Sequence, residues 1–190
     1  MDSTRRQAQL GTQTIHLTGI VPAPGERLRG KFVVPAARRA DRPLTAEDLC
    51  RGVIVVSTLP NIHKHACLSQ IVDLEERGRA LSEQLRIVHI SADHESHWQE
   101  VDQFHPNIQA AGYSLCSADA ASREAFVTAF GVGVEGHRRI AHGLFLLREG
   151  VFLKSEVPTD QMRSVEVTQF LRDAARCLMT VERSAIGRHS

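Results

Sequence analysis

The 190-residue sequence predicts one α/β domain with a mixed central sheet and helices on both faces. Two observations carry this prediction. Apolar runs rich in β-branched residues alternate with amphipathic segments through the middle of the chain, a pattern typical of parallel strands joined by helices. Near the C-terminus, two apolar runs are separated only by Arg148-Glu-Gly150, which indicates a hairpin and therefore an antiparallel edge.

The composition excludes several classes of partner. Net charge is +1 and aromatic residues make up 5%, so neither a strong field nor a stacking surface favours nucleic acid. The apolar runs are too short to span a bilayer, and the polar N-terminus lacks the apolar core of a signal peptide. We therefore expect a cytoplasmic protein that has no nucleic-acid partner and no membrane partner.

Short strands and turns are predicted for the N-terminal third. Residues 1–13 are polar and are expected to form a mobile tail. The segment Thr14–Val21 predicts a strand, Pro22–Gly25 a turn, and Lys31–Pro35 a second short strand. The arginine-rich segment 38–43 is interpreted as a solvated loop.

The rest of the chain predicts strands and helices in alternation, followed by a hairpin and a closing helix. The strands are expected at Val53–Leu59, Leu85–Ser91, Tyr113–Ser117, Gly143–Leu147 and Val151–Val157. The helices are expected from Cys67 onward and at His94–Phe104, Asp119–Phe130 and Val165–Met179, the third one stopped by Gly131. With no repeat or linker, residues 14–180 are interpreted as one domain, and 181–190 as a polar tail.

Cys67 is the strongest candidate for a reactive residue. An apolar strand leads into a loop that contains Pro60, and Cys67 then opens a helix. Unpaired N–H groups and the helix dipole stabilise a thiolate at such a position, and Lys64 lies three residues upstream. The pattern predicts a depressed pKa and makes Cys67 the most reactive of four widely spaced cysteines. The alternative is a buried cysteine that only packs the first turn.

A second hypothesis concerns the alternating residues His63, His65 and Cys67. Two imidazoles and a thiol at this spacing are ligands that a soft metal ion prefers. The alternative is a pair of solvent-exposed loop histidines, since the chain has ten histidines and short clusters arise by chance. No other cofactor is expected.

Several segments in this order resemble the thiol peroxidase branch of the peroxiredoxins, the atypical two-cysteine group. The shared features are the leading hairpin over 14–34, the strand followed by Pro60 and Cys67, and the segments Ile90-Ser-Ala-Asp93 and Ala129-Phe-Gly-Val132. The resemblance covers residues from about Thr14 to Cys177. It implies a thioredoxin-like fold with Cys67 at the peroxidatic position.

The resemblance also shows where this chain departs from the family. A Thr or Ser is expected three residues before the cysteine, where Lys64 stands. The family's active-site arginine precedes a late strand, where His142 stands, with Arg139 just upstream as an alternative cation. The helix that carries the family's resolving cysteine has none here. Cys116 is the nearest alternative, and we expect a core strand to hold it away from Cys67.

The function implied is a thiol-dependent peroxidase that reduces hydrogen peroxide or small organic hydroperoxides through Cys67. Thioredoxin or a small thiol would supply the electrons, and the resemblance implies a homodimer. The alternative is a catalytically degenerate relative that acts as a redox sensor, or as a metal-binding protein through His63, His65 and Cys67. Peroxide consumption and metal content distinguish the two.

Overall fold

A six-stranded mixed sheet forms the centre of the protein. The computed structural model describes residues 6–81, 85–163 and 165–186. The strand order is β11 (Val151–Glu156), β10 (Gly143–Arg148), β6 (Val53–Leu59), β7 (Arg86–Ser91), β8 (Ala111–Ser114) and β4 (Ala36–Arg38). Strands β6, β7 and β8 run parallel, whereas β10, β11 and β4 are antiparallel to their neighbours. The predicted mixed sheet with an antiparallel edge is confirmed.

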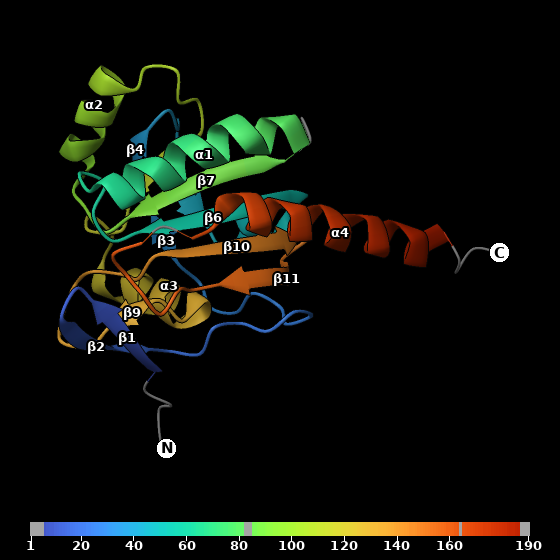
Figure 1. Ribbon diagram of the computed structural model, residues 1–190, viewed down its shortest axis with the longest axis horizontal. Helices are drawn as coiled ribbons and strands as arrows, with labels where there is room; N and C mark the ends of the chain where they lie inside the picture. The colour runs from blue at the N-terminus through green and yellow to red at the C-terminus, as the bar shows by residue number, and fades with distance from the viewer. Residues whose placement is uncertain (1–5, 82–84, 164, 187–190) are drawn as a thin grey trace.

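Helices cover both faces of this sheet (Figure 1). They are η1 (Glu47–Cys50), α1 (His65–Leu81), α2 (Glu95–Phe104), α3 (Ala120–Phe130) and α4 (Val167–Ile186). Along β6, Val55 packs with α1 and α4, whereas Ile54 and Val56 pack in the larger core with α3. Because β6 is buried on both faces, its first four residues, Val53–Val56, form a continuous apolar run rather than an alternating pattern.

The N-terminal segment corrects the expectation of a mobile tail. Residues 6–10 form β1 (Arg6–Leu10), which pairs with β2 (Gln13–Thr18). The leading hairpin therefore spans 6–18, and the expected pairing over 14–34 is wrong. Strand β2 also pairs with β9 (Gly133–Val134), and β3 (Val33–Val34) pairs with β5 (Leu44–Thr45) instead. Only Ala8 of β1 is buried, so its sequence alternation is weak.

Helix ends mostly follow the expected capping chemistry. The Asp119 side chain accepts from the Ser122 backbone N–H at 2.9 Å, and α3 ends at Gly131 with φ 62°. A Cβ at Gly131 would lie 2.5 Å from the Ile20 backbone. Both the positive φ and this close approach therefore require glycine. Helix α4 continues to Ile186, so residues 181–186 are helical rather than part of a tail.

Arg38 corrects the interpretation of the arginine-rich segment as a solvated loop. Its side chain is 1% exposed and donates to Asp102 Oδ1 at 2.8 Å and to the Ala110 carbonyl at 3.0 Å. It therefore pins β4 to α2 and to the segment that leads into β8. Among the residues that the structure describes, no helix is both long enough and apolar enough to cross a membrane.

Candidate active site around Cys67

Cys67 lies in the first turn of α1, directly beyond the loop that follows β6. Its backbone N–H donates to the Lys64 carbonyl at 3.0 Å. One turn later, the buried Gln70 side chain donates to the Ser57 hydroxyl at 2.9 Å and accepts from the Val165 backbone N–H at 3.3 Å. These hydrogen bonds tie α1 to the strand behind it, so the position of Cys67 is set by a rigid part of the fold.

His142 lies against the Cys67 sulfur. The distance from Sγ to Nε2 is 3.5 Å, and the two residues are 0% and 1% exposed. His142 directly precedes β10, and the antiparallel pairing of β10 with β6 brings Gly143 opposite Thr58. Sheet pairing thus joins two side chains that are 75 positions apart. The His142 backbone N–H also donates to Gln161 Oε1 at 2.7 Å, which fixes the segment before β10.

Burial sets the protonation of both groups. It raises the pKa of the Cys67 thiol to about 12, with a nearby Asp93 carboxylate adding to the rise. A hydrogen bond from the Asn61 backbone and the charge of Arg139 lower this pKa by smaller amounts. Burial lowers the pKa of His142 to about 4. At neutral pH the site therefore holds a neutral thiol beside a neutral imidazole.

The expected depression of the Cys67 pKa is wrong. Lys64 is exposed to solvent, and Arg139 is the cation that acts on the sulfur. Removal of the sulfur from water is the largest effect, and it outweighs the lowering by the Asn61 backbone hydrogen bond and by the charge of Arg139. Lys64 lines the cavity from an exposed position.

A cavity of about 540 Å³ opens onto Cys67 and His142. Its polar lining includes Lys64, His137, Arg139 and Gln161. Its apolar lining comes from the loop before α1, the N-terminal hairpin, strand β9 and the segments before β10 and α4: Pro60, Leu10, Ile15, Val134, Ile140 and Met162. Arg139 donates to the Pro60 carbonyl at 2.8 Å, which joins two sides of the opening.

The structure brings most of the predicted site residues together around one cavity: Pro60, Lys64, His65, Cys67, Arg139 and His142. Cys116 lies elsewhere. It is exposed rather than held in the core, because β8 ends two residues before it at Ser114. Cys116 is also absent from the residues that line the cavity at Cys67.

The three residues of the metal hypothesis have separate partners. His63 Nδ1 lies 3.2 Å from Glu100 Oε2, and His65 Nδ1 lies 3.4 Å from the Ser69 hydroxyl. Cys67 faces His142 instead. Within residues 6–81, 85–163 and 165–186, no group of three or more His, Cys, Asp and Glu residues is arranged to hold a metal ion. This geometry gives the metal hypothesis no support.

Two residues that position the site had no assigned role in the sequence analysis. Asp93 Oδ2 accepts from the Ile62 backbone N–H at 2.7 Å and from the Ser91 hydroxyl at 2.8 Å, which fixes the loop before α1. Asp93 ends the segment that carried the family resemblance, so that segment was a usable signal. Gln161, which holds His142, has no sequence signal, because the contact depends on the fold.

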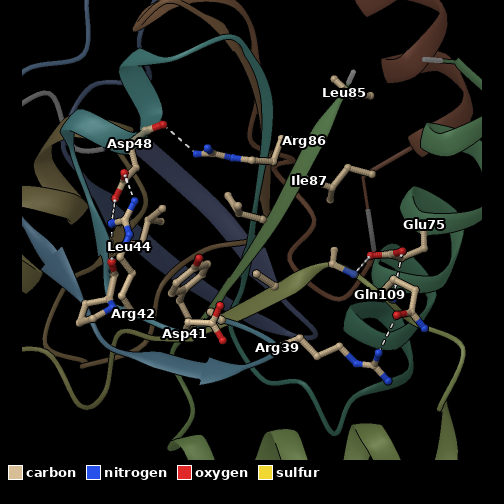
Figure 2. Close-up of a pocket in the computed structure, with 16 residues that line it drawn as sticks. Arg39, Asp41, Arg42, Leu44, Asp48, Glu75, Leu85, Arg86, Ile87 and Gln109 are labelled. Carbon is tan, nitrogen blue, oxygen red and sulfur yellow. Dashed lines mark hydrogen bonds and ion pairs between the residues drawn. The ribbon is translucent and has the colours of Figure 1, made fainter. Parts of the chain in front are cut away.

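A larger hollow of about 980 Å³ lies elsewhere, at the start of β7 (Figure 2). Its arginines have partners within the fold. Arg42 binds both oxygens of Asp48 at 2.7 and 2.6 Å, and Arg86 donates to the Asp48 carbonyl at 2.7 Å. Arg39 donates to Gln109 at 2.6 Å. Because these contacts have a structural explanation and no described cysteine, serine or histidine lines the hollow, we place the candidate active site at Cys67.

Comparisons with known proteins agree with this fold. No protein-family model and no curated protein matches the sequence. A peroxiredoxin-like protein from Aquifex aeolicus has a TM-score of 0.71 and 15% identity over 90% of this chain and 97% of its own. A thiol peroxidase from Chromobacterium violaceum has a TM-score of 0.72 and 18% identity over 94% and 98%.

A third structure, AhpC from Enterococcus faecalis, has a TM-score of 0.71 and 16% identity over 85% of this chain and 95% of its own. The identities are low, so these likenesses establish the architecture and leave the chemistry to the residues of the site. The chain has the thioredoxin-like fold that these peroxiredoxin-type proteins share.

Proposed function

We propose that this protein is a thiol-dependent peroxidase in which Cys67 reduces a hydroperoxide. The observation that carries the proposal is the placement of the Cys67 sulfur. It lies in the first turn of α1, at a cavity of about 540 Å³, with an imidazole nitrogen at 3.5 Å. A positioned sulfur with a base beside it is the arrangement that nucleophilic catalysis requires.

In the proposed reaction, Sγ attacks one peroxide oxygen and the O–O bond breaks. The sulfur becomes a sulfenic acid, and the other oxygen leaves as an alcohol or as water once it has gained a proton. A thiol from outside then attacks the sulfenic acid, which releases water and forms a mixed disulfide. A second thiol frees Cys67. Thioredoxin or a small thiol fits this role, because Cys116 is exposed and does not line the cavity.

The walls of the cavity favour an organic hydroperoxide over hydrogen peroxide. Leu10 and Met162 are 42% and 57% exposed and form part of the cavity lining, and Ile15, Val134 and Ile140 add further apolar surface. Covering such surface with the alkyl or aryl part of a substrate contributes binding that hydrogen peroxide lacks. We therefore expect a lower KM for an aryl hydroperoxide.

The protonated state of Cys67 supports the alternative of a redox sensor. A thiol whose pKa is raised to about 12 reacts slowly, and a sensor needs only one oxidation rather than many turnovers. The two functions differ in the fate of the oxidised sulfur. A peroxidase returns to the thiol with added reductant and continues, whereas a sensor stays oxidised.

The test uses the purified full chain with cumene hydroperoxide and dithiothreitol. We expect several equivalents of hydroperoxide to be consumed per protein, and a Cys67→Ser variant to consume none above the reductant alone. Consumption that stops after one equivalent supports the sensor. Consumption that is unchanged in Cys67→Ser contradicts both. Metal analysis of the same preparation tests the His63, His65 and Cys67 hypothesis directly.

A further inference from the structure

The Cys67–His142 contact bears on how protons move during the reaction. A thiol must lose its proton to attack a peroxide, and the oxygen that leaves must gain one. At this site the sulfur is fully buried, and the group within reach of its proton is Nε2 of His142, at 3.5 Å. An arginine at the same place could stabilise negative charge but could not accept a proton.

The imidazole is held in a state that can accept this proton. Burial keeps His142 neutral at pH 7 by lowering its pKa, so one ring nitrogen carries a lone pair. Nδ1 is buried and has no hydrogen-bond partner in the part of the chain that the structure describes. A ring whose Nδ1 carries the hydrogen presents Nε2 as an acceptor to the thiol. Without a carboxylate on Nδ1, the imidazolium form is costly, so the ring can hold the proton only briefly.

The charged groups around the pair do not take over this role. Arg139 acts on the sulfur through its charge, but its guanidinium donates to the Pro60 carbonyl and has no proton-accepting atom. Lys64, His65 and His137 line the same cavity from exposed positions. The Asp93 carboxylate is occupied by the Ile62 N–H and the Ser91 hydroxyl. Among the described side chains, His142 is the one whose nitrogen lies against Sγ.

We propose that His142 is a catalytic residue that carries the Cys67 proton to the leaving oxygen. As Sγ bonds to the attacked peroxide oxygen, the S–H proton passes to Nε2, and the O–O bond breaks. The imidazolium then donates this proton to the departing alkoxide, which leaves as the alcohol. Sulfur is oxidised to the sulfenic acid, the hydroperoxide is reduced, and no further reactant is needed. This inference rests on the proposed peroxidase function.

The mechanism has a distinctive pH dependence. Because the proton stays within the site, we expect a rate of Cys67 oxidation that is nearly constant between about pH 5 and 9, inside the limits set by the two pKa values. Without His142, only the small thiolate fraction reacts, so the rate rises about tenfold per pH unit. A role in positioning alone would lower the rate without changing this slope.

The experiment follows single-turnover oxidation of Cys67 by cumene hydroperoxide from pH 5 to 9, by quenched flow and mass spectrometry. The wild type is compared with His142→Gln and with His105→Gln, a histidine at the end of α2 outside the cavity. We expect His142→Gln to be at least about a hundredfold slower at pH 7 and to gain the steep slope. His105→Gln should match the wild type.

The outcomes separate the two proposals. If the wild type oxidises Cys67 and His142→Gln keeps its rate and flat profile, the role of His142 is wrong and the peroxidase function stands. If the wild type leaves Cys67 unoxidised, the proposed function itself is wrong. Should His142→Gln fail to fold, the wild-type rate in D₂O decides instead. A roughly twofold or larger slowing supports proton transfer in the rate-limiting step, and an unchanged rate contradicts it.

Discussion

The hollow at the start of β7 and the smaller cavity at Cys67 use their polar groups in opposite ways. In the larger one, Arg42 and Asp48 neutralise each other and Arg86 donates to a backbone carbonyl (Figure 2). In the smaller one, the Cys67 thiol and the His142 imidazole are both neutral, and Sγ lies 3.5 Å from Nε2. The charged groups of the larger hollow bind partners within the fold. The thiol and the imidazole of the smaller one are instead in the protonation states that a proton transfer requires.

This difference shows why cavity size does not identify the active site here. Paired charges gain little by binding a ligand, because the ligand must first displace a partner that already satisfies them. The neutral thiol and the unprotonated ring carry no paired charges, and they are arranged for proton transfer. We therefore expect substitutions in the larger hollow to change stability, and substitutions in the smaller one to change reactivity.

The largest effect is expected for Cys67→Ser. A hydroxyl cannot replace a thiol as the nucleophile, so hydroperoxide consumption should fall by at least about a hundredfold. Cys116→Ser is the matched control, because Cys116 is exposed and absent from the cavity lining. It should retain the wild-type rate in an assay with excess dithiothreitol. A large loss in Cys116→Ser would indicate a two-cysteine cycle.

The larger hollow is tested by Asp48→Ala. The Asp48 carboxylate accepts from Arg42 and from the Thr45 N–H and hydroxyl, and these donors would lose their acceptor. We expect the free energy of unfolding to fall by about 2–3 kcal/mol, measured by urea denaturation. The rate of Cys67 oxidation at 25 °C should stay within about twofold. A rate loss greater than the fraction unfolded would mean that this hollow contributes to the chemistry.

Acid should destabilise the protein through His142. Below about pH 6.5 the unfolded chain protonates this ring, whereas the folded protein does not until the pH approaches its lowered pKa of about 4. The unfolded state therefore binds more protons, and stability falls as the pH decreases through this window, by about 2 kcal/mol at pH 5. Burial also lowers the pKa of His89, which adds in the same direction.

Urea denaturation at pH 7 and pH 5 measures this effect. His142→Gln should show the smaller loss that remains from His89, while His105→Gln should follow the wild type. An equal loss in the wild type and in His142→Gln would mean that the ring is not buried in its neutral form.

The cations near the sulfur should give the smallest effects on the oxidation rate, and Arg139→Gln the larger of the two. The charge of Arg139 lowers the Cys67 pKa, but burial dominates that pKa, so we expect a loss in the oxidation rate of only about threefold to tenfold. Lys64→Gln should change it by less than about twofold, because Lys64 does not act on the sulfur. Stopped-flow oxidation in low and high salt measures both. A larger loss in Lys64→Gln would restore Lys64 as the activating cation.

Much of the fold was predictable because its signals are local. The apolar run Val53–Leu59 and the Asp119 and Gly131 caps of α3 indicated element types that the structure confirms. The segment Arg6–Leu10 was missed because its pairing with β2 buries only Ala8. Arg38 was misplaced because its partner Asp102 is 64 positions away, and no local pattern encodes that contact.

The sequence predicted which residues form the site, but it did not predict the direction of the Cys67 pKa shift. Aligning the apolar strand after His142 with the late strand of the resembled family placed His142 at the position of the family's arginine. The fold brings this position to Cys67. The direction of the Cys67 pKa shift was wrong because sequence gives charge and helix position but not burial depth. Cys116 was placed in the core because the predicted strand ran on to Ser117, whereas β8 ends at Ser114.

The most direct test of the central claim is to identify the residue that one equivalent of hydroperoxide oxidises. One equivalent of cumene hydroperoxide is added to the reduced protein without a thiol, a sulfenic acid trap is included, and peptides are mapped by mass spectrometry. We predict that Cys67 carries the trapped sulfenic acid while the exposed Cys50 and Cys116 remain thiols. Oxidation of Cys50, Cys116 or Met162 with Cys67 left unmodified would contradict the assignment of Cys67 as the peroxide-reactive residue.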